Sequence, residues 1–426
     1  MAVRYTSGEL SFSTTERQEF LRCRRAWDFQ SPNRRSLQRK GLPQVALHVG
    51  SAVHYGLEAQ ALGLDPLGAI EKFFDVEAAR VAREYADRVG APMGLEERNQ
   101  LAESRVLVRA MIQRYFDKWG WDNPLGDYEY IAPEVSFRVP IPLEKYADEI
   151  DYTGPRLFLV GTFDGLGRKR NVTPTREVWL IEHKTYSQRP DFSSLQTDDQ
   201  MHGYSWAAQQ LFGIPVAGAL YDGIAKKTPT VPQILLAGTV SVAWVDTDAE
   251  TMLKRIQECH GDAWHDLPLM AGKKQKVVDG VPQTLMDHYE PFIARLQERD
   301  AGDQTPFHTR HRVHFKQVAI QRWERDLCHL AVDMVDPKIY PNFPWSGCWD
   351  CNVRDLCNAV QFGEDLEYVI RRDYRIGTYG TRKAQKDLSP EEVNSIADLE
   401  GIMERKRREY AGVEPVREAG DIPPGL

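Results

Sequence analysis

Three charged residues lie within two apolar segments of the sequence. Asp164 ends the run 157–164, which reads LFLVGTFD, while Glu182 and Lys184 lie in the run 177–185, which reads EVWLIEHKT. Carboxylates are preferred ligands of hard divalent cations. A neighbouring lysine can stabilise the negative charge that develops in a transition state. Such a group could support metal-dependent hydrolysis of a phosphodiester bond.

The two apolar runs predict a β-hairpin, because both are rich in β-branched and aromatic residues and the stretch 171–174 between them contains Asn, Thr and Pro. If the turn is centred on Thr173, Asp164 lies directly opposite Glu182, with Cβ atoms about 5 Å apart. Strand alternation then puts Glu182 and Lys184 on one face. Charges converging on hydrophobic strands need compensation, which a cation supplies. The alternative is a surface hairpin with solvated charges.

Two further segments could add to this group. Residues 199–209 predict a helix, on which Gln200 and Tyr204 are four residues apart and share a face. Upstream, Gly50 opens another predicted helix, with His54 near its start. A single histidine is usually a packed or surface residue, but beside the two acids His54 could act as an additional metal ligand.

In this combination the residues resemble the PD-(D/E)XK nucleases, and within them the RecB-like exonuclease branch. That branch carries a Gly-x-x-x-His helix, a Gly-x-x-Asp strand, an acid-x-Lys strand and a Gln-x-x-x-Tyr helix, in that order. The matching residues here are Gly50/His54, Gly161/Asp164, Glu182/Lys184 and Gln200/Tyr204. The resemblance covers roughly residues 10–360. It implies an α/β fold with a restriction-endonuclease-like core, which is a central mixed sheet flanked by helices, plus a helical insertion.

The resemblance also implies roles for these residues. The ligands of Mg²⁺ or Mn²⁺ would be His54, Asp164, Glu182 and the carbonyl of His183. Lys184 would orient or activate the attacking water, and Gln200 and Tyr204 would hold the substrate strand or brace the site. The implied activity is that of a metal-dependent DNA nuclease that acts in recombination, repair or mobile-element processing. Since members of this branch are typically exonucleases, the resemblance also implies cleavage from single-stranded ends. One departure is Glu182, where many relatives have Asp.

The cysteines give a second signal. Cys348, Cys351 and Cys357 form a C-x2-C-x5-C trio, and Cys23 lies alone near the N-terminus. Three thiols lack one tetrahedral ligand, which Cys23 could supply. The RecB-like branch includes AddB-type helicase-nucleases and CRISPR adaptation nucleases, in which this layout binds a [4Fe-4S] cluster. The resemblance therefore implies a cluster that clasps the two ends of the core. Structural Zn²⁺ is the alternative, since four thiolates suit either.

Composition bounds the function classes. The chain has 426 residues and a net charge of −8. No apolar run approaches a membrane span, and the first residues lack a signal-peptide core, so we expect a cytoplasmic protein that uses no membrane. Although the net charge is negative, DNA binding depends on local charge. Basic clusters occur at Arg22/Arg24/Arg25, Arg34/Arg35/Arg39/Lys40, Arg168/Lys169/Arg170, Lys226/Lys227, Lys273/Lys274/Lys276 and Arg310/Arg312/Lys316.

Two other functional hypotheses remain open. One is a catalytically silent fold that only binds DNA. The other is a subunit that depends on a helicase or recombinase partner within a larger recombination or CRISPR-type assembly. The chain contains no phosphate-loop motif of the type Gly-x4-Gly-Lys-Ser/Thr. A motor would therefore come from another chain.

The motif positions suggest an organisation in five parts. These are an N-terminal helix and basic segment with the first cysteine (1–47), a helical insertion with the histidine motif (48–127), the nuclease core (128–245), a helical part with the cysteine trio (246–360) and a charged tail (361–426).

Local patterns predict further elements within these parts. The predicted elements are a helix over 11–30 with a capping box at Ser13, strands over 239–245 and 310–315, and helices over 317–335 and 388–410. Glu134 falls on the first predicted core strand, where it either faces the site or is solvated. Cys259 and Cys328 are expected to pack as small hydrophobic residues.

Overall fold

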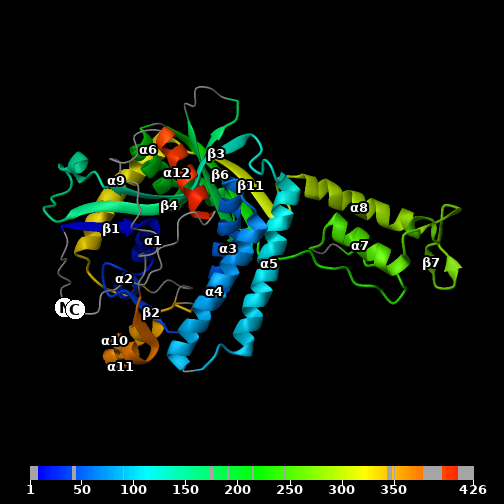
Figure 1. Ribbon diagram of the computed structural model, residues 1–426, viewed down its shortest axis with the longest axis horizontal. Coiled ribbons are helices and arrows are strands. Elements are labelled where there is room, and N and C mark those ends of the chain that lie inside the picture. Colours follow the sequence, from blue (N-terminus) through cyan, green and yellow to red (C-terminus); the bar gives the residue numbers. More distant parts are fainter. Residues whose placement is uncertain are drawn as a thin grey trace.

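A computed structural model describes residues 8–40, 45–89, 91–171, 177–189, 191–213, 215–243, 246–342, 348–349, 351–377 and 396–410. Among these residues, the largest sheet has six strands (Figure 1). They are β1 (Glu9–Ser13), β3 (Tyr128–Pro140), β4 (Arg156–Lys169), β5 (Val178–Tyr186), β6 (Val216–Ala225) and β11 (His308–His314). The order is β1-β4-β5-β6-β11, with β3 also paired to β4. The pairs β1/β4 and β5/β6 are parallel and the others are antiparallel, so the sheet is mixed.

The two edges of β4 are used differently. Along one edge β3 pairs with residues 158–169, apart from the position of Asp164. Since a strand has only two edges, β1 and β5 must share the other one. There β1 pairs with residues 156–160 and β5 with residues 165–167. Residues 161–164 lie in the gap between these two ladders, at the place where the neighbouring strands separate.

The predicted hairpin is confirmed as β4 and β5. Gly165 is paired with Ile181 and Leu166 with Leu180, and this register extends by one position to put Asp164 opposite Glu182. The pairing corresponds to a turn centred on Thr173, which itself lies outside the described residues. From Val178 to His183 the residues of β5 are buried on both faces, as expected for a strand covered by helices on both sides.

Helices cover both faces of the sheet. On one side α3 (Val45–Ala61), α4 (Pro66–Val89) and α5 (Leu95–Trp119) pack together, and their shared core includes Ile224 of β6. On the other side α1 (Thr14–Arg22), α6 (Asp199–Phe212) and α9 (Gln317–Val335) enclose the main core. The helix α12 (Ile396–Tyr410) lies along β3 (Figure 1). This arrangement is the α/β fold with a helix-flanked mixed sheet that the sequence predicted.

The helix α6 shows how the chain sets the position of one site element. Asp198 accepts a hydrogen bond from the Met201 N–H and caps the first turn. Gly213, with φ +62°, ends the helix in the left-handed conformation that glycine adopts without strain. Between these ends α6 packs on β6, so that its first turn faces the sheet near β5.

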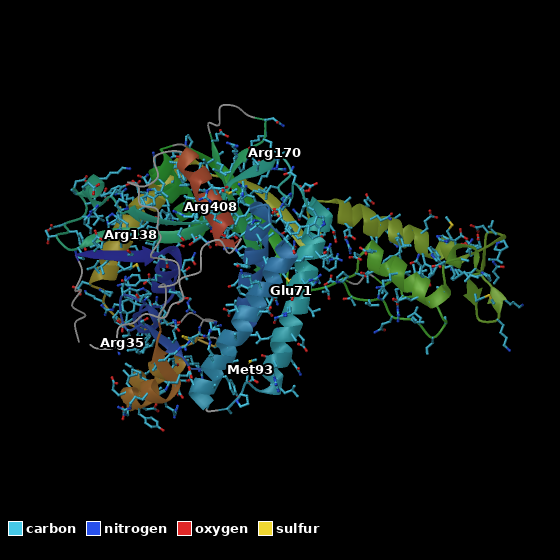
Figure 2. All side chains as sticks on the ribbon, in the orientation of Figure 1. Arg35, Glu71, Met93, Arg138, Arg170 and Arg408 are labelled. Atoms are coloured by element: carbon cyan, nitrogen blue, oxygen red, sulfur yellow. The ribbon has the colours of Figure 1, made fainter. Side chains whose placement is uncertain are left out.

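Two smaller units extend from this core. The first combines α2 (Arg24–Gln30), β2 (Leu37–Arg39), α10 (Arg354–Phe362), α11 (Leu366–Asp373) and β12 (Tyr374–Ile376) around a separate apolar cluster. Its Asp28 pairs with Arg34 and Arg35, the latter labelled in Figure 2. The second contains α7 (Ala249–His260), α8 (Leu285–Ala301) and four two-residue strands, and it projects away from the sheet (Figure 1). Those strands are β7 (Met270–Ala271), β8 (Lys274–Gln275), β9 (Val277–Val278) and β10 (Val281–Pro282).

Short 3₁₀ segments η1 (Leu143–Tyr146), η2 (Phe192–Thr197) and η3 (Trp264–Asp266) complete the described elements. Among the helices that the structure describes, none is both long enough and apolar enough to cross a membrane.

Several predicted elements match the structure and others do not. The helix over 317–335 and the edge strand near 310–315 are confirmed as α9 and β11. The helix over 11–30 was wrong in two respects. Residues up to Ser13 belong to β1, and Cys23, in extended conformation, separates α1 from α2. The predicted capping box at Ser13 is present, since Ser13 and Glu16 exchange side-chain and backbone hydrogen bonds.

The strand predicted over 239–245 was also wrong. Within the described part of this segment Val240 makes a single bridge to Ile234, and its N–H donates to the Tyr289 hydroxyl. The physical reason is that β11 already occupies the edge of β6, so the apolar residues of 239–243 pack against α8 instead. In the tail, α12 begins at Ile396, while 388–395 fall outside the described residues.

A buried ion pair links β6 and β11. The Arg310 Nε and Nη2 atoms lie 2.6 and 2.7 Å from the two Asp222 carboxylate oxygens, and Tyr115 donates its hydroxyl to Asp222. The Arg310 guanidinium also stacks 3.9 Å from the centre of the Trp119 ring. Arg310 therefore serves the core, while Arg312 and Lys316 of the predicted basic cluster remain exposed.

Replacing Arg310 is expected to leave the Asp222 carboxylate buried without its cation. The variant Arg310→Met should lose about 3–5 kcal/mol of unfolding free energy, measured by urea denaturation. As a matched control on the same strand, Arg312→Met should change it by less than about 1 kcal/mol, because the ion pair of Arg312 is exposed. Equal stabilities of the two variants would show that the Arg310–Asp222 pair does not hold β6 to β11.

Candidate active site

Three side chains from three elements converge beside the gap in the β4 edge. His54 on α3, Glu134 on β3 and Asp164 on β4 place one ligand atom each within 4.8 Å of the others. The His54 Nδ1 atom lies 3.1 Å from Glu134 Oε1 and 3.4 Å from Asp164 Oδ1. In the described part of the chain, no other set of three potential ligands meets this distance. One imidazole and two carboxylates are a suitable donor set for Mg²⁺ or Mn²⁺.

Asp164 is oriented by the separation of the strands. Its Oδ2 atom accepts a hydrogen bond of 2.9 Å from the His183 backbone N–H. This N–H bonds a side chain of the neighbouring strand instead of continuing the β4–β5 ladder. The other carboxylate oxygen, Oδ1, is then held toward His54.

Glu134 has a backbone conformation that is uncommon for its residue type. It lies between the pairs Pro133/Gly165 and Val135/Phe163, opposite Asp164, and its φ is +47°. A residue other than glycine rarely adopts this left-handed conformation within a strand, and such local strain gathers at functional sites. Here it turns the Glu134 carboxylate toward His54.

A residue of the C-terminal helix stabilises this conformation. Lys406 on α12 donates from Nζ to the carbonyl oxygens of Pro133 and Glu134, at 3.0 and 2.8 Å. The same ammonium pairs with Glu58, one helical turn after His54 on α3. Lys406 therefore connects the backbone at Glu134 to the helix that carries His54.

A second group of residues lies next to the first. Lys184 pairs with Glu182 and donates a hydrogen bond of 3.0 Å to Gln200 Oε1, while Gln200 Nε2 donates to Glu182 Oε1 at 3.1 Å. Glu182 is 1% exposed, so its carboxylate depends on these partners. One turn further along α6, the Tyr204 ring packs edge-on against Phe137 and Phe163.

Charge crowding shifts the ionisation of the site. Burial raises the pKa of Glu182 to about 7, and Asp164 adds to the rise while Lys184 opposes it. Burial alone would lower the pKa of His54, but Asp164 and Glu134 outweigh it and raise that pKa to about 9. The pKa of Lys184 is also raised, because Glu182 and Asp164 outweigh its burial. These shifts show an excess of negative charge that a cation would relieve.

The His183 ring lies edge-on to the His54 ring, with the two ring centres 6.4 Å apart, and its nitrogen atoms face residues outside both groups. Its Nε2 atom lies 2.7 Å from the Tyr130 hydroxyl, and its Nδ1 atom lies 3.8 Å from Asp222. Burial lowers the pKa of this imidazole. His183 thus meets the site through its backbone, and its predicted role as a carbonyl ligand remains a prediction.

The four cysteines proposed as ligands fall in one small unit. Cys23 separates α1 from α2, Cys348 and Cys351 precede α10, and Cys357 lies on α10. Cys23 and Cys351 pack against the same apolar cluster, and Arg25 Nη1 lies 3.8 Å from Cys357 Sγ. Burial raises the pKa of Cys351, and the neighbouring Cys23 and Cys348 add to the rise. All four are free thiols, the ligand type of zinc and iron–sulfur sites, but no three of their sulfur atoms lie within 4.8 Å of one another.

The remaining two cysteines occupy apolar surroundings, as expected. Cys328 is buried in the main core, and Cys259 packs against the core of the projecting unit.

Comparison with known proteins identifies the family of this chain. A model of the PD-(D/E)XK nuclease superfamily matches residues 11–358, most of the chain. The protein therefore belongs to the PD-(D/E)XK nuclease superfamily. A search of curated proteins finds no match.

The sequence pattern predicted most of the residues that lie in the candidate site. His54, Asp164, Glu182, Lys184 and Gln200 all lie in one of the two groups. Glu134 was left open between a site acid and a solvated residue, and the structure places it against His54. Lys406 was missed, since no local signal relates it to a strand 272 residues earlier.

Removal of the Glu134 charge tests its place in the site. We expect Glu134→Gln to weaken Mn²⁺ binding, measured by titration calorimetry, by more than about tenfold, since even outer-shell partners contribute that much. The control Glu144→Gln changes an exposed carboxylate on η1 and should bind as wild type does. Wild-type affinity in Glu134→Gln would remove Glu134 from the ligand set.

Proposed function

We propose that this protein is a metal-dependent DNA nuclease that hydrolyses phosphodiester bonds, with single-stranded ends as its substrate. The observation that carries the proposal is the convergence of His54, Glu134 and Asp164 beside the Glu182–Lys184 pair. Membership of the superfamily supports a nuclease and a DNA substrate. The exonuclease mode and a role in recombination, repair or mobile-element processing are parts of the proposal that rest on the RecB-like motif order.

In this proposal His54, Glu134 and Asp164 hold a Mg²⁺ or Mn²⁺ ion, with Glu182 and the His183 carbonyl as further ligands. The ion would supply Lewis-acid polarisation of the phosphate and a bound water of lowered pKa. Lys184 is held beside this position by Glu182 and Gln200. From there its ammonium can donate to the attacking water and offset charge on the pentavalent transition state.

Gln200 orients the two charged partners, because its amide donates to Glu182 and accepts from Lys184. Tyr204 supports the same region through its ring contacts with Phe137 and Phe163. Gln200 and Tyr204 therefore act as positioning residues for the reacting groups.

Two alternatives make different demands on the site. A silent DNA-binding fold has no need of buried Glu182 or of the charge crowding around His54, which is costly without a cation. A subunit that acts with a helicase or recombinase is compatible with the site, since the chain lacks a phosphate-loop motif. Co-purification with a motor protein would distinguish this form of the proposal from an enzyme that acts alone.

Cleavage assays test the nuclease directly. End-labelled single- and double-stranded DNA should be trimmed by wild type in Mg²⁺ or Mn²⁺. In Lys184→Ala the rate should fall by about a hundredfold or more, as for loss of one donor to a transition-state charge. The control Lys254→Ala removes an exposed lysine of α7 and should retain the wild-type rate. An undiminished rate in Lys184→Ala would contradict the mechanism, and inactive folded wild type would favour the DNA-binding alternative.

We further propose that Cys23, Cys348, Cys351 and Cys357 hold a [4Fe-4S] cluster, with structural Zn²⁺ as the alternative. Their place at the junction of α1, α2 and α10 would join the first residues of the core to its end. The role would be structural, since the thiols lie in a unit with its own apolar cluster.

Metal analysis of protein purified without oxygen distinguishes a [4Fe-4S] cluster from structural Zn²⁺. Iron and acid-labile sulfide are expected in wild type. Both should be lost in Cys351→Ala together with a lower melting temperature, because a structural metal site contributes directly to folding. As a control, Cys259→Ala should keep both. Zinc without iron would establish the structural Zn²⁺ site. A stable wild type with neither iron nor zinc would show that these cysteines hold no metal group.

A further inference from the structure

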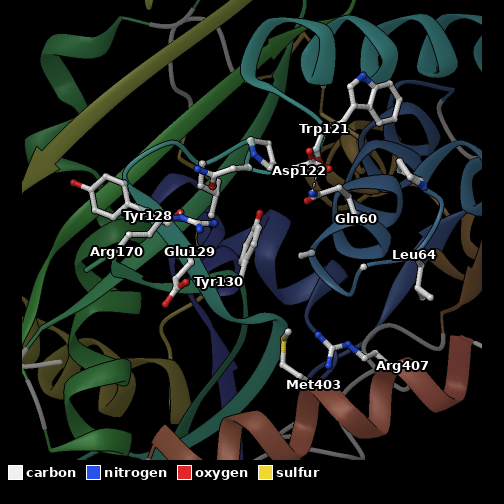
Figure 3. Close-up of a pocket in the computed structure, with 16 residues that line it drawn as sticks. Gln60, Leu64, Trp121, Asp122, Tyr128, Glu129, Tyr130, Arg170, Met403 and Arg407 are labelled. Atoms are coloured by element: carbon white, nitrogen blue, oxygen red, sulfur yellow. Dashed lines mark hydrogen bonds between the residues drawn. The ribbon is translucent and has the colours of Figure 1, made fainter. Parts of the chain in front are cut away.

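A pocket of about 560 Å³ is lined by residues of α3, β3 and α12 (Figure 3). Its walls come from the end of α3, the segment 121–125, the start of β3 and α12. Tyr130 stands on one side of the opening, with Gln60 above it and Met403 and Arg407 below. Arg170 lies further along the same rim. This volume falls in the range of small-molecule and cofactor sites.

The walls of this pocket also carry the metal site. Gln60 follows His54 by six residues on α3, which is about 9 Å along the helix. Tyr130 precedes Glu134 by four residues on β3, or roughly 13 Å. Arg407 follows Lys406, which holds the backbone at Glu134. These spacings correspond to a few nucleotides of one strand, since the rise per nucleotide is about 3.4 Å even when bases are stacked.

The lining has the chemistry of a nucleotide site. The Tyr130 ring and the Met403 thioether offer apolar surfaces on which a base can stack. Arg170 and Arg407 bring two guanidinium groups to the rim, the groups best suited to phosphate oxygens. Gln60, Asp122 and Asn123 also line the pocket, where the Gln60 and Asn123 amide groups donate to the Trp121 and Gly126 carbonyls.

Hydrogen bonds hold this lining in place. Tyr130 is fixed through its hydroxyl to His183, whose N–H holds Asp164. The Arg170 Nε atom donates to the Tyr128 carbonyl at 3.0 Å, and the Arg407 Nε atom donates to the Leu62 carbonyl at 3.0 Å. Each guanidinium group is thus bonded to the backbone of another segment, and that of Arg407 also pairs with Glu404 at 3.7 Å.

We propose that this pocket binds one unstacked nucleotide of the single-stranded substrate, a few positions from the bond that is cleaved. The base would stack on Tyr130 and its phosphate would lie between Arg170 and Arg407. This inference rests on the proposed function, and it adds a subsite that selects single strands, because a paired base cannot leave its stack without an energetic penalty.

The test measures binding of a short fluorescent single strand to the full-length protein in Ca²⁺ by anisotropy. One nucleotide of the strand is replaced by an abasic site, position by position. At one position, loss of the base should weaken wild-type binding roughly tenfold. Tyr130→Leu should bind the intact strand about tenfold more weakly and should no longer distinguish that abasic position. Tyr130→Phe also lacks the hydroxyl that contacts His183, but it keeps the aromatic ring. This variant should bind both the intact and the abasic strand as wild type does.

A second pair of variants tests the phosphate contact independently of Tyr130. Arg407→Ala should weaken binding and reduce the slope of log K against log salt by about one. Arg408→Ala removes an exposed guanidinium from the same helix (labelled in Figure 2) and should leave the slope unchanged. If Tyr130→Leu does not fold, this pair still decides.

The proposed subsite would be refuted if the abasic site weakened binding to Tyr130→Leu as much as it weakens binding to wild type. It would also be refuted if Arg407→Ala and Arg408→Ala had the same affinity and the same salt slope. Cleavage of the same strand in Mn²⁺ distinguishes failure of the subsite from failure of the proposed nuclease function. A wild type that cleaves without these couplings refutes the subsite alone. A wild type that neither binds nor cleaves refutes the proposed function as well.

Discussion

The structure depends on the convergence of three carboxylates, Glu134, Asp164 and Glu182, in a largely buried space. His54 contacts Glu134 and Asp164, and Lys184 pairs with Glu182, so these two side chains offset part of the negative charge. In a low-dielectric interior such repulsion is severe unless a cation or a proton relieves it. Burial and the neighbouring Asp164 raise the pKa of Glu182 to about 7, and Asp164 and Glu134 raise the pKa of His54 to about 9. A divalent ion is the simplest way to stabilise the arrangement.

The sheet creates the space for this convergence. Because β1 and β5 leave residues 161–164 unpaired on one edge of β4, the carboxylate of Asp164 can take a backbone donor from β5. Glu134 reaches the same point only through a left-handed backbone, which Lys406 of α12 stabilises from outside the sheet. The site is therefore assembled from four distant parts of the chain. Its geometry depends on α3 and α12 as well as on the catalytic strands.

The local parts of this design could be predicted from the sequence. A turn centred on Thr173 places Asp164 opposite Glu182 by counting, and the pairs Gly165/Ile181 and Leu166/Leu180 have this register. The spacing of Gln200 and Tyr204 predicted that they share one face of a helix, and in α6 Gln200 bonds both Glu182 and Lys184. The apolar residues 239–243 do not form a strand of the sheet, because β11 already occupies the edge of β6. The positive φ of Glu134 and its contact with Lys406 are tertiary features, and no periodicity encodes them.

We infer that His54, Glu134 and Asp164 bind one divalent cation. Anomalous diffraction from a crystal grown with Mn²⁺ would test this inference, because it locates the ion without assuming any ligand. We expect a manganese peak between these three side chains, close to the Glu182–Lys184 pair. A peak elsewhere, or no peak at a Mn²⁺ concentration that supports cleavage, would contradict the inference.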